Sequence, residues 1–199
     1  MAGATGLSRA LLMSSRNTTS LLPGLNRIIS CLLTVLLLSA PVMAEEAPLS
    51  ESRVKTDFLY NFSRFVTWPP AALQDRPEFT LCVFGTDPFG AELDNLTGKA
   101  VQDKTLVVRR HNSLALVDDC QLVYISENAE LTAILFLLRE QPVLTVGDAP
   151  DFIEQGGIIQ FIAIEDKVRF RINAGAAKSA GLNISSKLLS LAASVTGSN

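Results

Sequence analysis

Residues 156–192 constrain the fold of this chain most strongly, because two strands of different character follow one another there. Residues 158–164 are apolar on both faces, which is typical of a strand that is covered from two sides. Residues 167–172 alternate strictly between basic and apolar positions, so that one face packs and the other meets solvent. The first strand is therefore expected inside a sheet. The second strand carries a basic row on its outer face, which consists of Lys167, Arg169 and Arg171.

The same stretch ends in two short helical patterns. Asn173 is expected to cap an Ala-rich helix, and Gly181 is expected to end it. A closing helix follows, whose apolar stripe consists of Ile184, Leu188, Leu189 and Ala192. No catalytic constellation lies in this stretch, which is interpreted as a scaffold with a surface.

Strands and helices alternate in the rest of the chain. A helix is expected over residues 50–66, and a second one from Asp87, as its cap, to Gly98. A third helix is expected after Ser126, and strands are expected over 79–85, 106–109, 122–125 and 143–146. This order predicts a single-domain α/β sandwich with a mostly parallel central sheet that is flanked by helices.

Residues 1–44 have the features of a secretory signal peptide. They contain three Arg and no acidic residue, with an apolar run of about 11 residues, which is shorter than the ~20 of a membrane span. Small residues end at Ala44 as in a cleavage site, so residues 45–199 are expected to form the mature domain in the periplasm. Lipidation at Cys31 is disfavoured, because the apolar run follows this cysteine instead of preceding it.

The charge balance argues against nucleic acid as a partner. The chain has 17 Lys and Arg, of which three lie in the expected signal peptide, and this leaves 14 against 20 Asp and Glu. An acidic domain without a concentrated basic patch lacks the release of counterions that drives binding to phosphate backbones.

Two cysteines, Cys82 and Cys120, lie outside the expected signal peptide, and they mature in a compartment that oxidises thiols. A disulfide between them would close a loop of about 39 residues and stabilise the fold by roughly 3–4 kcal/mol. Two buried free thiols are the alternative, because the sequence does not show that the two Cβ atoms approach each other.

The sequence predicts no catalytic residues, no metal site and no cofactor. The two glycines of Gly85–Gly90 have the spacing of a phosphate loop, but Ala91 and Glu92 stand where such a loop needs lysine and a hydroxyl residue. His111 is the only histidine, and no nucleophile or metal-ligand motif accompanies it in the sequence. The protein is therefore not expected to be an enzyme.

A set of short motifs runs through most of the expected mature chain: Lys55 with Phe58–Phe62 and Trp68-Pro69, Cys82 with Asp87-Pro88-Phe89, Cys120 with Tyr124, Gly147-Asp148, and the stretches 167–170 and 185–189. Together these motifs resemble the YfiR-like periplasmic family. The resemblance implies a small α/β sandwich that regulates another protein without catalysis.

The resemblance also implies partners. A member of the family represses an inner-membrane diguanylate cyclase by binding its periplasmic sensor domain, which keeps cyclic di-GMP low. An outer-membrane lipoprotein of the OmpA/Pal type takes this repressor away. The resemblance further implies a bridge between Cys82 and Cys120, whereas a second cysteine pair of some relatives is absent from this chain.

The basic row allows two interpretations. Its charge protects an edge strand against aggregation, or it meets an acidic patch, since Arg pairs with carboxylates through two hydrogen bonds. Tyr60 and Trp68 are expected to be exposed aromatic residues, and with the basic row they form the predicted partner-binding set. One alternative function stays open, a sensor that binds a small ligand in the crevice at the carboxyl ends of the strands. The oligomeric state also stays open, and a homodimer is one of the expected assemblies.

Overall fold

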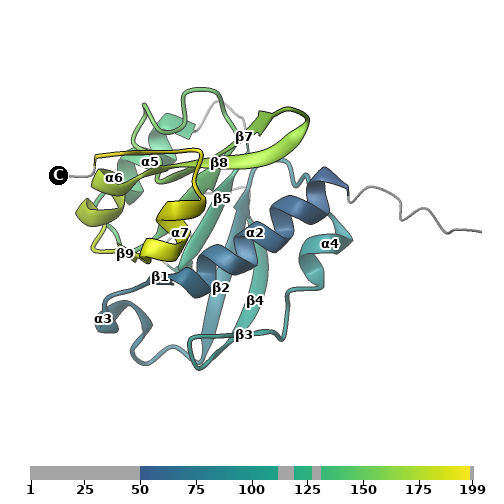
Figure 1. Ribbon diagram of the computed structural model, residues 1–199. Helices are drawn as coiled ribbons and strands as arrows, with labels where there is room; N and C mark the ends of the chain where they lie inside the picture. The colour runs from purple at the N-terminus through teal and green to yellow at the C-terminus, as the bar shows by residue number, and fades with distance from the viewer. Residues whose placement is uncertain (1–49, 112–118, 127–130, 198–199) are drawn as a thin grey trace, which may run out of the picture. The chain divides into compact units, whose positions relative to one another are not determined.

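The computed structural model describes residues 50–111, 119–126 and 131–197, so the predicted signal peptide and its cleavage site lie outside the described residues. The described residues form one α/β domain around an eight-stranded sheet (Figure 1). The strands of this sheet are β2 (Glu78–Phe84), β3 (Ala100–Val101), β4 (Lys104–His111), β5 (Leu122–Ile125), β6 (Leu144–Gly147), β7 (Ile159–Ile164), β8 (Lys167–Asn173) and β10 (Ser194–Thr196).

The sheet is mostly parallel, as the order of the elements predicts. Its strands follow one another as β10-β8-β7-β6-β5-β2-β4-β3, and only the pairs β7–β8 and β3–β4 are antiparallel. A separate antiparallel pair, β1 (Val66–Thr67) with β9 (Asn183–Ile184), ties the N-terminal part of the domain to its C-terminal part. The predicted α/β fold is therefore confirmed.

Helices cover both faces of the sheet. They are α2 (Glu51–Phe65), α3 (Pro70–Leu73), α4 (Ala91–Asp94), α5 (Leu131–Leu138), α6 (Ala174–Ser179) and α7 (Ser186–Leu191). One buried cluster joins residues of α2, α4, α6 and α7 to one face, and a second cluster joins α5 to the other. Figure 1 shows α2 running across the near face of the sheet. Among the described residues, no helix combines the length and the apolar character that crossing a membrane requires.

The helix α2 supplies the central contacts of the larger cluster. Ser50 caps it, because its hydroxyl accepts the backbone N–H of Arg53 at 3.3 Å. The ring of Phe62 is fully buried and lies 5.7 Å from the ring of Phe161 and 5.0 Å from that of Phe170. These two rings belong to β7 and β8, so α2 holds this pair of strands in place.

The strands β7 and β8 continue as a two-stranded ribbon beyond the end of β6. The partners of β6 on β7 are only Ile159 and Gln160, whereas β7 and β8 pair at six positions. The turn residues Glu165 and Asp166 have φ values of 50° and 57°, which match the twist of a two-residue hairpin. In Figure 1 the ribbon reaches toward the beginning of α2.

This ribbon corrects part of the prediction for residues 158–164. The first half of β7 is buried between β6 and β8, as predicted. The second half projects past β6, so that Ile164 is 43% exposed. The strand β8 has β10 as a second neighbour only from Arg171 to Asn173, and its first half is an edge. The edge interpretation of the basic row therefore fits Lys167 and Arg169 best.

The predicted helix from Asp87 to Gly98 is shorter than expected. The carboxylate of Asp87 accepts the backbone N–H groups of Phe89 at 2.7 Å and of Gly90 at 3.3 Å, which makes a local turn. The helix α4 begins only at Ala91, because Gly90 has a φ of 55° that no helix can contain.

The C-terminal helices follow the sequence closely. The side chain of Asn173 accepts the N–H of Ala176 at 2.9 Å, and Gly181 has a φ of 71° after the end of α6. The closing helix α7 starts after Ser185, whose hydroxyl caps it. Ile184 pairs within β9 and does not belong to the helix, because it is the partner of Val66 across the small antiparallel pair.

Candidate functional site

A pocket of about 1100 Å³ opens at the carboxyl ends of the parallel strands. Thr86 follows β2, Ser126 follows β5 and Asp148 follows β6, and all three residues line the pocket. Within the sheet, β4 lies next to β2 in one direction, and β5 and then β6 follow in the other direction. The strand order therefore reverses between β2 and β5. Open α/β sheets bind ligands at such a point, where the strand order reverses. The fold thus places a candidate site in the predicted crevice.

The other walls of this pocket come from α2 and from the β7–β8 ribbon. All three residues of the basic row line it. The row and the crevice, which the sequence presents as separate features, therefore belong to one site. Its apolar wall consists of Val54, Phe58, Phe161, Ile162 and Val168.

The three basic residues differ in their surroundings. Lys167 and Arg169 are exposed, and no carboxylate among the described residues forms an ion pair with either of them. Arg171 is half-buried: its guanidinium donates to the side-chain oxygen of Gln160 and lies 3.6 Å from a carboxylate oxygen of Glu154. Lys167 and Arg169 are thus the residues that can meet an external anion.

A second polar group lies in the same pocket and joins three elements. The ammonium of Lys55 lies 3.0 Å from a carboxylate oxygen of Asp148 and 2.7 Å from one of Glu51. The hydroxyl of Tyr124 donates to the same oxygen of Asp148 at 2.7 Å. We call Lys55, Tyr124 and Asp148 the polar cluster. It links α2, β5 and the loop after β6.

The polar cluster keeps its protons at neutral pH. Burial lowers the pKa of Lys55, but hydrogen bonds and charge attraction from Glu51 and Asp148 outweigh burial and leave the pKa raised. Burial raises the pKa of the Tyr124 hydroxyl above its usual range, and the charge of Asp148 adds to this effect. Lys55 is therefore a cation and Tyr124 a neutral donor, so this part of the pocket is a fixed set of hydrogen bonds.

The sequence contains the polar cluster without revealing its role. Lys55, Tyr124 and Asp148 all belong to the motifs that carry the family resemblance, but Lys55 and Asp148 lie 93 residues apart. Two local features could have pointed to them: a tyrosine within an otherwise apolar strand, and an aspartate directly after one. Neither feature identifies its partner.

We expect Asp148→Asn to lower the free energy of unfolding by about 1–2 kcal/mol, because it removes the less exposed of the two carboxylates that compensate Lys55, whose side chain is only 12% exposed. Asp166→Asn is the matched control, since Asp166 lines the same pocket but is exposed on a turn. Its effect should stay within about 0.5 kcal/mol. Urea denaturation at pH 7 measures both values, and equal effects would contradict a structural role for the cluster.

The two predicted aromatic anchors do not lie at this pocket. The prediction that Trp68 is exposed is wrong: its side chain is 3% exposed, packs edge-on against Phe79 at 5.0 Å and donates to the backbone oxygen of Gln121 at 3.1 Å. Tyr60 is half-buried, and its hydroxyl donates to the backbone oxygen of Ala100 at 3.2 Å. Trp68 is therefore a core residue, and a partner role for Tyr60 stays a prediction.

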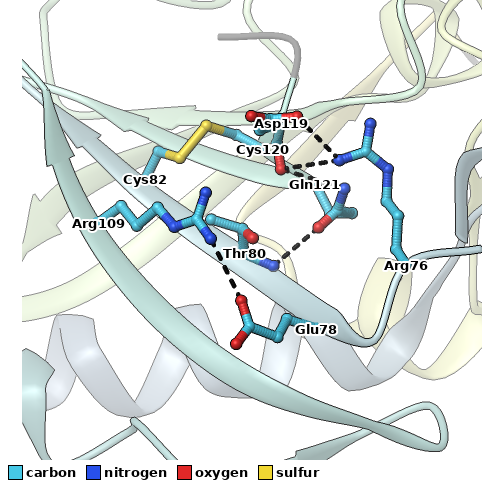
Figure 2. Close-up of a disulfide and its surroundings, with 8 residues drawn as sticks. All are labelled: Arg76, Glu78, Thr80, Cys82, Arg109, Asp119, Cys120 and Gln121. Atoms are coloured by element: carbon cyan, nitrogen blue, oxygen red, sulfur yellow. Dashed lines mark hydrogen bonds and ion pairs between the residues drawn. A yellow bond between two sulfur atoms is a disulfide. The ribbon is translucent and has the colours of Figure 1, made fainter. Parts of the chain in front are cut away.

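The structure contains the disulfide between Cys82 and Cys120 (Figure 2). Both residues are buried, and their Cα atoms lie 5.9 Å apart, within the usual range for a bridge. The neighbouring backbone is joined independently, because Gln121 donates its N–H to the oxygen of Thr80 at 3.0 Å and accepts the N–H of Thr80 with its side chain at 2.7 Å. The bridge thus links β2 to the segment just before β5.

A comparison with known families finds one match over most of the described chain. A family model described as YfiR/HmsC-like matches residues 52–193, which is more than half of the chain. No curated protein matches the sequence. The match spans the polar cluster, the disulfide and the β7–β8 ribbon together.

Proposed function

Because the chain belongs to the YfiR/HmsC-like family, we propose that it is a periplasmic regulatory protein that represses an inner-membrane diguanylate cyclase. It acts by binding the periplasmic sensor domain of the cyclase, and this lowers cyclic di-GMP. An outer-membrane lipoprotein of the OmpA/Pal type removes it from the cyclase. The protein works by binding and without catalysis, since a regulator needs only a different affinity for the active and the inactive cyclase.

The observation that carries this proposal is the β7–β8 ribbon. It projects past the sheet and presents Lys167 and Arg169 without acidic partners among the described residues. Ile164, at 43% exposure, lies on the same ribbon. Exposed Arg beside apolar surface is the composition from which binding energy arises at protein interfaces. The matching partner surface is an acidic patch with an apolar centre.

The proposal is tested first in cells. Deletion of the gene should raise cyclic di-GMP, and expression of the protein with its own export signal should bring the level back. A variant without residues 1–44 should fail to do so, because it stays on the wrong side of the inner membrane. Unchanged cyclic di-GMP in the deletion strain would contradict the proposal.

Binding is tested in solution with the isolated sensor domain of the membrane cyclase from the same organism. The complex should weaken as salt rises from 50 to 500 mM, since exposed charges are screened. Sedimentation of the free protein and of the complex in the same buffers shows whether a homodimer or a monomer binds the cyclase domain. A sensor domain that does not bind at either salt concentration would contradict this partner.

A second candidate function is the binding of a small anionic ligand, and the pocket at the carboxyl ends favours it. The pocket combines an apolar wall with Lys167 and Arg169, so it suits an acid that has an apolar body. A thermal-shift screen with such acids, in the absence of any protein partner, separates this function from cyclase binding. Matched neutral amides are the control, and equal shifts with acids and amides would argue against recognition of the anion.

A further inference from the structure

The only histidine of the chain lies beside the disulfide. The sulfur atoms of Cys82 and Cys120 and a ring nitrogen of His111 all lie within 4.8 Å of one another. Cys82 is in β2, His111 ends β4, and Cys120 lies just before β5. Residues from β2, from the end of β4 and from the segment just before β5 thus offer one nitrogen and two sulfur atoms at a single place.

The backbone of the sheet holds these three residues together without help from the disulfide. Cys82 is the partner of Arg109 in the β2–β4 pair, and His111 follows two positions later on the same face of β4. Cys120 is held because Gln121 donates its N–H to the oxygen of Thr80. Reduction of the bridge breaks only the sulfur–sulfur bond, so the three side chains are expected to stay close.

We propose that the reduced protein binds one divalent cation of the zinc type through the side chains of Cys82, Cys120 and His111. Two thiolates and one imidazole are a known ligand set for zinc, with a water molecule as the fourth ligand. Thiolate and imidazole also disfavour magnesium and calcium, which prefer oxygen ligands. The oxidised protein lacks this site, because its sulfur atoms are bonded to each other.

Metal binding requires that the bridge is reduced first. A small dithiol reagent reduces the buried bridge by thiol–disulfide exchange: the reagent becomes a disulfide, and Cys82 and Cys120 become thiols. The cation then replaces the protons of the two thiols, which are released to water. Metal binding therefore favours the reduced form and joins β2, β4 and the start of β5 in place of the covalent bond.

Arg109 and Arg110 of β4 lie near this site, but carboxylates neutralise both guanidinium groups, so they repel a bound cation only weakly. The guanidinium of Arg109 lies 3.2 Å from a carboxylate oxygen of Glu78. That of Arg110 lies 2.7 Å from oxygens of both Asp87 and Asp94. These carboxylates compensate the two positive charges before the cation arrives.

The test uses the full chain with Cys31→Ser, so that Cys82 and Cys120 carry the only thiols. A phosphine reduces the bridge and becomes a phosphine oxide with oxygen from water. Co²⁺ is then added as the probe, because a tetrahedral thiolate site gives it intense visible bands and a charge-transfer band. We expect one Co²⁺ per reduced chain, displacement of Co²⁺ by Zn²⁺, and no such spectrum from the oxidised chain.

His111→Ala should weaken Co²⁺ binding by at least about tenfold. Asp119→Asn is the matched control, because Asp119 is adjacent to Cys120 in the sequence but does not belong to the cluster. Its affinity should stay within about twofold of the parent. Circular dichroism of both oxidised variants checks that they fold.

Thermal unfolding of the reduced chain gives a second, independent measurement. Zn²⁺ should raise the melting temperature of the reduced parent and raise that of the reduced His111→Ala variant clearly less, since the variant binds the cation more weakly. Absence of the Co²⁺ spectrum, full affinity in His111→Ala, or a reduced chain that stays unfolded in the presence of Zn²⁺ would each overturn the proposal.

Discussion

Replacement of both Cys82 and Cys120 by Ala is expected to lower the free energy of unfolding by about 3–4 kcal/mol. The bridge joins residues that are 38 positions apart, and its loss frees the unfolded chain of that constraint. Both side chains are buried, so the two alanines also leave small voids. A domain of this size has a total stability of about 5–15 kcal/mol, of which the expected loss is a large share. Urea denaturation in the presence of a chelator measures it.

The reduced parent protein is the control for this substitution. In a chelator it should lose nearly as much stability as the double Ala variant, because both lack the same bond. Non-reducing mass spectrometry of the periplasmic protein should show a peptide that contains Cys82 linked to one that contains Cys120. Free thiols at both positions, together with unchanged stability of the double variant, would contradict a structural bridge.

Lys167→Glu combined with Arg169→Glu is expected to weaken binding to the cyclase sensor domain by on the order of 100-fold. Both residues are exposed and form no ion pair within the described part of the chain, so the reversal turns two attractions into two repulsions. The free energy of unfolding should change by less than about 0.5 kcal/mol, because neither side chain is buried or ion-paired within the described residues. Cells that carry this variant should have cyclic di-GMP close to the level of the deletion strain.

Arg139→Glu combined with Lys178→Glu is the matched control for this pair. It changes the net charge by the same amount. Arg139 directly follows α5 and Lys178 lies in α6, and both residues are exposed and away from the β7–β8 ribbon. Binding should fall by less than about threefold, through the long-range effect of net charge on association. An equal loss with both pairs would mean that net charge decides the affinity and the ribbon is not the contact surface.

Arg171 is the member of the basic row that this experiment leaves unchanged. Its guanidinium donates to Gln160, which is buried and in turn donates to the backbone oxygens of Ala149 and Pro150 at 2.6 and 2.7 Å. A glutamate at this position would face Glu154 and an acceptor on Gln160. The three residues of the basic row thus have two different roles. Lys167 and Arg169 are exposed, whereas Arg171 supports the loop after β6 through Gln160.

The secondary structure could be predicted where local chemistry decides it. The apolar and basic alternation of β8, the cap at Asn173 and the glycine after α6 all act over a few residues, and each is found where the sequence predicts it. The prediction failed at Asp87, because a capping residue of a helix and an Asx turn use the same carboxylate bonds. Only the φ of Gly90 separates the two.

Trp68 shows why exposure is harder to predict than secondary structure. Its position before two prolines indicates a chain turn, and turns usually lie at the surface. Whether the indole is buried depends on Phe79 and on the backbone of Gln121, which lies 53 residues away. No local pattern contains that information.

By itself, the sequence determined the alternating elements, the mostly parallel sheet and the basic row, because hydrophobic period, caps and residue chemistry are local properties. The pairing of Cys82 with Cys120 was an expectation, and the structure decided it by placing their Cα atoms 5.9 Å apart. Only the tertiary structure decided which of these features share a site. It brought the basic row into the pocket at the carboxyl ends, joined Lys55 to Asp148, and placed His111 beside the disulfide. The physical reason is that strand register and helix packing bring together side chains that the chain separates by tens of residues.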